Sequence, residues 1–123
     1  TAYASRYALD PVRAVELVRA AGGVCSLAHP ARTEGSRGAA APLEMVERMV
    51  AAGLGGIEAD HPSHNSKQAR YWRGVAGDLG VVVTGSSDDH GTLTGRRLGC
   101  RTTAPEAFEQ LIAPATGTSL IKG

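Results

Sequence analysis

The segment AAGGVCSLAHP, residues 20–30, contains the signals that decide the fold of this chain. Gly22 and Gly23 end a preceding helical pattern, because glycine is the usual residue just past the end of a helix. Residues 24–28 then form a short apolar run, which is typical of a buried strand in a parallel sheet. This strand ends at His29, so a helix, a strand and a polar strand end follow one another directly.

The same succession continues on both sides of this segment. Asp10 and Pro11 suit a helix start, because aspartate caps helix N-termini and proline is tolerated in the first turn. Ser66 is expected to cap a later helix, and Thr103 with Glu106 has capping-box spacing. Apolar spacing predicts helices over residues 11–21, 42–52, 66–79 and 103–112, and strands over residues 24–28, 56–59, 81–84 and 119–121.

Strands that alternate with helices indicate an α/β fold with a parallel sheet. With three or four strands, the chain is either a small three-layer sheet or a segment of a barrel. Its 123 residues and 12.7 kDa correspond to one domain or part of one. No linker or internal repeat divides it.

Composition excludes several classes of protein. The formal charge of +1 gives no broad basic surface for duplex DNA, and aromatic residues at 4% do not favour a stacking platform for single strands. No apolar run reaches membrane-spanning length, and no signal peptide is visible. Cys25 and Cys100 lie far apart without a CxxC motif, which predicts two free thiols in a reducing cytoplasm.

Potential ligands follow each of the first three predicted strands. His29 follows the first, His61 and His64 follow the second, and Asp88 and His90 follow the third. The carboxyl ends of parallel strands share one edge, where α/β proteins build their sites. One histidine before proline is more often structural, but three such strand ends together favour a metal or phosphate site. Carboxylate and imidazole donors suit Zn, Mn or Fe.

Other polar residues lie at the same predicted edge. Arg32, Arg96 and Arg97 are each expected to be solvated surface charges, but as a set near a metal they could bind phosphate oxygens. Ser86 has no histidine arranged to activate it, so a serine nucleophile is not favoured. Glu58 lies within a strand and is expected to pair with a nearby arginine or histidine rather than to act as an acid catalyst.

Three segments together resemble the PHP phosphoesterases, the polymerase and histidinol phosphatase superfamily. The segment over residues 20–30 resembles the family's GG-apolar-AHP motif. GLGGIE at 53–58, followed by HPSH at 61–64, resembles its GL-x-GIE and HP-x-H motifs, and GSSDDHG at 85–91 resembles its GGSDFHG motif. Three motifs in the family's order cover nearly the whole chain. The most similar group is the bacterial enzymes that dephosphorylate nucleoside 3′,5′-bisphosphates and trim short RNA from its 5′ end.

The resemblance implies a distorted (β/α)7 barrel that binds two or three divalent metal ions. It assigns metal ligation to the AHP histidine and to the aspartate and histidine of the third motif. It also assigns substrate-phosphate contacts to the HP-x-H histidines and to the arginine after AHP. In such a site a metal-activated water attacks phosphorus, and the metals with arginine stabilise the charge that develops. The implied metal ligands are His29, Asp88 and His90, and the implied substrate-binding residues are Arg32, His61 and His64.

The chain also departs from the family pattern. The family's N-terminal HxH motif is absent, so residues 1–123 are expected to be the C-terminal part of a PHP domain. Such a part is expected to have little activity alone, and to self-associate or bind the rest of the fold through open strand edges. Asp89 stands where the family usually carries an aromatic residue, and Asp60 where it often carries tyrosine.

Two alternatives remain open from the sequence. One is a non-catalytic α/β fragment or binding module with only a partial metal site. The other is a small flavodoxin-like binding domain, which would bind no divalent metal at His29 and Asp88. Metal binding at these two residues therefore separates the flavodoxin-like reading from the others.

Overall fold

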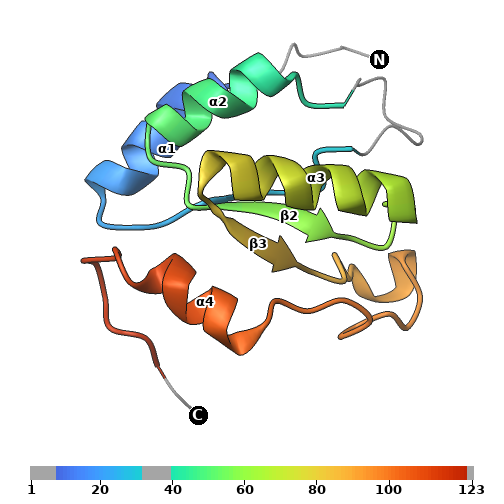
Figure 1. Cartoon of the computed structure of the whole chain (residues 1–123). Helices are drawn as coiled ribbons and strands as arrows, with labels where there is room; N and C mark the ends of the chain where they lie inside the picture. The colour runs from blue at the N-terminus through green and yellow to red at the C-terminus, as the bar shows by residue number, and fades with distance from the viewer. Residues whose placement is uncertain (1–7, 32–39, 122–123) are drawn as a thin grey trace, which may run out of the picture.

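A computed structural model describes residues 8–31 and 40–121 of the chain. Helices and strands alternate along these residues, as predicted from the sequence (Figure 1). The elements are α1 (Pro11–Ala20), β1 (Ser26–Leu27), α2 (Leu43–Ala51), β2 (Gly56–Asp60), α3 (Ser66–Leu79), β3 (Val82–Gly85), the 3-10 turn η1 (Gly91–Leu93) and α4 (Pro105–Ile112).

The three strands form one parallel sheet in the order β1-β2-β3. Its register aligns Ile57 with Leu27 on one side and with Val83 on the other. The next residue of β2, Glu58, is aligned with Thr84. Because side chains alternate across a strand, these two rows point to opposite faces of the sheet. One face is therefore apolar and the other polar.

Helices α1, α2 and α3 lie together on one side of the sheet, and α4 lies on the other side against β3 (Figure 1). The apolar row of the sheet faces the first three helices. Trp72 of α3 is 2% exposed, and Ile57 of β2 is fully buried. The core between these helices and the sheet consists of Val15, Ala31, Val46, Met49, Leu54, Ile57, Ala59, Trp72, Val75 and Ala76.

Two helix starts differ from the sequence prediction. The cap of α3 is Asn65 and not Ser66, because the Asn65 side chain accepts the Gln68 amide and Gln68 accepts the Asn65 amide, each at 2.9 Å. The predicted Thr103 capping box of α4 is wrong. The Thr103 hydroxyl instead accepts the Gly85 amide at 3.0 Å and donates to the Gly85 carbonyl at 2.9 Å. That contact attaches the start of α4 to the end of β3.

Two strand predictions also need correction. β1 is shorter than residues 24–28, because the chain leaves the ladder after Leu27 and the His29 amide bonds to a side chain of β2. The expected strand over residues 119–121 does not form. The amides of Thr116 and Gly117 donate to the Gly22 carbonyl, which holds the segment after α4 against the turn between α1 and β1.

Among the residues that the structure describes, no helix combines the length and the apolar character needed to cross a membrane. Cys25 and Cys100 are both free thiols, as predicted.

Candidate metal and phosphate site

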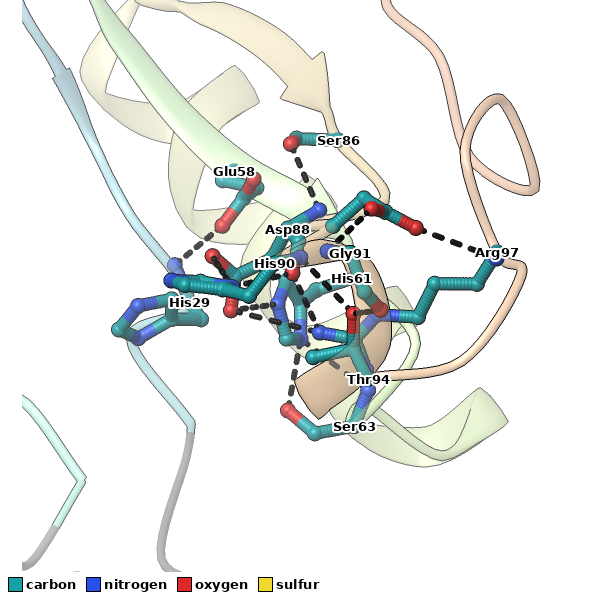
Figure 2. A network of polar contacts seen from close by, with 11 residues as sticks. His29, Glu58, His61, Ser63, Ser86, Asp88, His90, Gly91, Thr94 and Arg97 are labelled. Carbon is teal, nitrogen blue, oxygen red and sulfur yellow. Dashed lines mark hydrogen bonds and ion pairs between the residues drawn. The ribbon is translucent and has the colours of Figure 1, made fainter.

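The ends of the three strands bring together His29, His61, Asp88 and His90 (Figure 2). The His29 and His61 rings lie edge to face, with centroids 5.2 Å apart. Asp88 lies between two histidines: one carboxylate oxygen is 3.4 Å from His61 Nε2, and the other is 3.6 Å from His90 Nδ1. Residues separated by up to about sixty positions in the sequence thus share one edge of the sheet, as parallel topology requires.

The backbone at this edge is strained at two residues. His29 has φ of +29° and Asp88 has φ of +47°, and no other non-glycine residue in the described ranges has positive φ. Side chains with a Cβ rarely occupy this region, and such residues concentrate at functional sites. Both are residues that the resemblance assigns to metal ligation.

Hydrogen bonds to side chains hold the backbone of these two residues. The His29 amide donates to Glu58 Oε2 at 2.5 Å. The Asp88 amide donates to Ser86 Oγ at 3.0 Å, and the Arg97 guanidinium donates to the Asp88 carbonyl at 2.5 Å. Ser86 thus contributes a backbone contact, and Glu58 pairs with a histidine as expected, through the main-chain amide of His29 rather than through its ring.

The hydrogen bonds of two histidines fix which ring nitrogen carries a proton. His90 Nδ1 lies 2.8 Å from the Asp88 carbonyl, so this nitrogen donates and Nε2 is the nitrogen left to face a metal. His61 Nδ1 accepts the Ser63 amide at 3.1 Å, so Nε2 carries the hydrogen that faces Asp88. His90 can therefore bind a metal through Nε2, whereas neutral His61 is oriented as a donor.

His64 has a different environment from the other three histidines. It is 8% exposed, and its Nδ1 donates to the Ala59 carbonyl at 2.9 Å. Its Nε2 lies 3.4 Å from the Ala31 amide, which donates to it. Both ring nitrogens are thus engaged with backbone, and His64 joins the end of β2 to the residue that precedes Arg32. Arg32 itself, the predicted phosphate contact, lies outside the described residues.

Burial and neighbouring charged groups act in opposite directions on the pKa values of His61 and Asp88. Burial lowers the pKa of His61, although Glu58 and Asp88 act against this effect. Burial alone would raise the pKa of Asp88, but the hydrogen bond from His61 and the nearby His90 outweigh it, so the pKa is lowered. A neutral imidazole facing an ionised carboxylate is the state of these two groups near neutral pH.

Arg96 and Arg97 are neighbours in the loop after β3, but their side chains lie in different environments. Arg97 turns toward Asp88, with 3.7 Å between its guanidinium and an Asp88 carboxylate oxygen. Arg96 instead lines a cavity of about 600 Å³ together with Asp89, Thr92 and Leu98. Asp89 Oδ1 accepts the Gly91 amide at 2.8 Å, and its Oδ2 accepts the Arg97 amide at 3.2 Å. The Asp-x-Gly spacing of residues 89–91 is the sequence signal for this turn.

The donor types at the site fit a divalent metal ion. Imidazole nitrogens of His29 and His90 and carboxylate oxygens of Asp88 are ligands that Zn, Mn and Fe accept. The hydrogen bond from His90 Nδ1 to a carbonyl is the outer contact that metal-binding histidines usually make. Over residues 8–31 and 40–121, no three histidine, cysteine or acidic side chains already converge as a group able to hold an ion. The residues therefore fit a divalent ion in donor type, and further ligands would be needed to complete a centre.

No protein-family model matches the sequence. Comparisons with individual proteins do find a similar sequence and similar structures. The chain is 34% identical over 83 residues to an Eggerthella lenta protein named phosphoribosyl 1,2-cyclic phosphate 1,2-diphosphodiesterase. The match covers 68% of this chain and 29% of that protein.

Two solved structures have a similar fold. One is described as a metal-dependent phosphoesterase from Bifidobacterium adolescentis, with a TM-score of 0.82, 26% identity and coverage of 96% of this chain and 40% of that one. The other is an amidohydrolase from Chromobacterium violaceum with bound sulfate and no metal, with a TM-score of 0.65, 27% identity and coverage of 91% and 39%. The chain spans less than half the length of each of these relatives.

Proposed function

The chain belongs to the PHP superfamily, and on that premise we propose that it forms part of the active site of a metal-dependent phosphoesterase. The observation that carries this proposal is the meeting of three strand ends at Asp88, with two neighbouring histidines on its carboxylate. The strained backbone of His29 and Asp88 supports it, because strain of this kind is retained where a site requires it.

In the proposed site, His29, Asp88 and His90 bind a divalent ion of Mn, Zn or Fe. When bound, such ions lower the pKa of a coordinated water and neutralise charge on phosphate oxygens. The Asp88 carbonyl holds the proton of His90 on Nδ1 and so directs Nε2 outward. Arg32, His61 and His64 are the proposed contacts to the substrate phosphate. Because the His61 Nε2 proton faces Asp88 and both ring nitrogens of His64 bond to backbone, these two histidines would reach a phosphate only after those hydrogen bonds give way.

The proposed substrates are phosphate esters of nucleotides or of short RNA. The name of the Eggerthella lenta relative specifies a phosphorylated ribose, and the Chromobacterium violaceum relative holds sulfate, a tetrahedral oxyanion like phosphate. The near-neutral charge of +1 is compatible with one or a few phosphates bound at a local site. The free thiols of Cys25 and Cys100 support a cytoplasmic location.

Metal titration tests the proposed ligands directly. We expect the chain to bind Mn²⁺ in isothermal titration calorimetry, and Asp88→Asn to weaken that binding at least about tenfold. Asp78→Asn, in the last turns of α3 and away from the strand ends, is the matched control and should leave the affinity within about twofold. Equal affinity for the wild type and Asp88→Asn would contradict the assignment.

A second function, a non-catalytic module with a partial metal site, is favoured by one observation. The described side chains do not yet converge on an ion. We expect this chain alone to release little phosphate from a nucleoside 3′,5′-bisphosphate in the presence of Mn²⁺. Robust metal-dependent release by this chain would exclude the non-catalytic reading.

Self-association stays a prediction about the same chain. Leu93 and Leu98 in the loop after β3 are 87% and 86% exposed, so they present apolar surface near the site. Light scattering that found only a monodisperse monomer would argue against association.

A further inference from the structure

We propose that Glu58 and Arg97 are positioning residues, which hold His29 and Asp88 in the strained backbone conformations that aim their side chains at the metal. This inference rests on the proposed function, because it takes His29 and Asp88 as metal ligands. It concerns two residues that contact the main chain of those ligands rather than the metal.

The first step of the argument is the contact between Glu58 and His29. Glu58 lies on the polar face of β2, is 6% exposed, and accepts the His29 amide at 2.5 Å. The chain leaves β1 two residues before this amide, so the sheet ladder no longer binds it. A buried carboxylate bonded to an amide makes a strong charge-assisted hydrogen bond. Glu58 thereby fixes the chain at the point where φ becomes positive.

The second step is the equivalent contact of Arg97 with Asp88. The guanidinium donates to the Asp88 carbonyl at 2.5 Å and lies 3.7 Å from its carboxylate. The Arg97 amide is held in turn by Asp89, whose side chain also binds the Gly91 amide. Arg97 Nε is buried without a hydrogen-bond partner among the described groups. The loop therefore brings the Arg97 guanidinium to the Asp88 carbonyl and leaves Arg97 Nε without a hydrogen bond among the described groups.

The two residues carry opposite charges, which makes positioning distinguishable from a purely electrostatic effect. A cation near a metal ion opposes metal binding, so loss of Arg97 should strengthen binding if only its charge mattered. Positioning requires the reverse, because Asp88 would lose the contact that fixes its carbonyl. For Glu58, glutamine keeps an acceptor for the His29 amide and removes the negative charge. Glu58→Gln therefore separates the hydrogen bond that positions His29 from the effect of the charge.

Calorimetric titration of the chain with Mn²⁺ tests the proposal. We expect Glu58→Ala and Arg97→Ala each to weaken binding about 10- to 100-fold, the range seen when contacts behind metal ligands are removed. Glu58→Gln and Arg97→Lys should recover most of the affinity. Glu44→Ala on α2 and Arg101→Ala, both at exposed positions, are matched controls expected to stay within about twofold. Unchanged affinity in Glu58→Ala and Arg97→Ala, or tighter binding in Arg97→Ala, would overturn the proposal.

A metal-free measurement separates this proposal from the proposed function. The nuclear magnetic resonance coupling between the amide proton and Hα of a residue reports its φ. We expect positive φ at His29 and Asp88 in the wild type. Glu58→Ala should shift His29, and Arg97→Ala should shift Asp88, toward negative φ. If the wild-type chain binds no Mn²⁺ but these shifts occur, the metal assignment fails while the backbone role stands. If both residues keep positive φ in the variants, the positioning role is wrong whatever the metal affinity.

Discussion

Ile57 and Glu58 are neighbours on β2, yet their side chains enter opposite environments. Ile57 is fully buried among the apolar side chains of α1, α2 and α3. Glu58 lies on the other face, where Ser26, Thr84 and residues near α4 line a cavity of about 240 Å³. The pleat of the strands thus divides the molecule into a face that stabilises the fold and a face whose polar groups arrange the site.

Removing the Ile57 side chain should produce the largest loss of stability. Ile57→Ala removes fully buried methyl groups at the centre of the sheet, which costs about 2–5 kcal/mol in the free energy of unfolding. Urea denaturation followed by circular dichroism measures this loss. Leu43→Ala on α2, where the side chain is 41% exposed, is the control and should cost far less. A loss below about 1 kcal/mol at Ile57 would mean that the helix-covered face is not the main source of stability.

Gly85 tests the polar side at the point where β3 meets the segment before α4. A Cβ at this position would lie 2.5 Å from the Thr102 carbonyl oxygen and 2.9 Å from Asp60 Cβ. Gly85→Ala should therefore cost about 1–3 kcal/mol, because backbone must move to relieve the contact. Gly74→Ala within α3 is a matched control with open space around the position, and it should stabilise the helix by about 0.5–1 kcal/mol. Tolerance of Gly85→Ala would contradict the close approach of the segment before α4 to the end of β3.

The difference between the two faces also explains what the sequence could predict. The apolar face follows from local signals: glycines such as Gly80 end helices, and apolar residues recur with the period of a helix or strand. The strand ends that carry His29, His61 and Asp88 could be located in the same way. The contact from Glu58 to the His29 amide joins residues 29 positions apart, so no local pattern encodes it. Thr103 misled the prediction for the same reason, because its hydroxyl binds β3 instead of capping its own helix.

Lowering the pH should weaken the polar edge before it affects the apolar face. Burial keeps the pKa of His61 below its ordinary value of 6.5, so the unfolded chain binds this proton first. The stability that neutral His61 contributes is present above about pH 6.5 and is lost as the pH falls toward the folded pKa. We expect the urea midpoint to fall between pH 7 and pH 5, and to fall less steeply in His61→Gln. Identical slopes for the two proteins would show that another group titrates.

The pKa of Asp88 acts at lower pH with the same sign. Because it lies below the ordinary value of 3.8 in the folded protein, the ionised carboxylate stabilises the fold above about that pH. This contribution is lost as the pH falls through the folded pKa. The wild type should therefore show a further fall in the urea midpoint at acidic pH, below the range in which His61 titrates. We expect this further fall to be absent in Asp88→Asn. A curve for Asp88→Asn that coincided with the wild type at acidic pH would contradict this account.

The smallest effect on stability is expected where two side chains of the polar face form a hydrogen bond with each other. Ser26 Oγ and Thr84 Oγ1 are 2.7 Å apart across β2. Thr84→Val alone should cost about 1 kcal/mol, because it leaves the Ser26 hydroxyl without this partner. The double variant Ser26→Ala with Thr84→Val removes both groups and should have stability close to that of the wild type. A double-mutant cycle in urea measures this coupling. If the double variant were as unstable as the sum of the single ones, the polar face would contribute stability of its own, and the division of roles between the two faces would not hold.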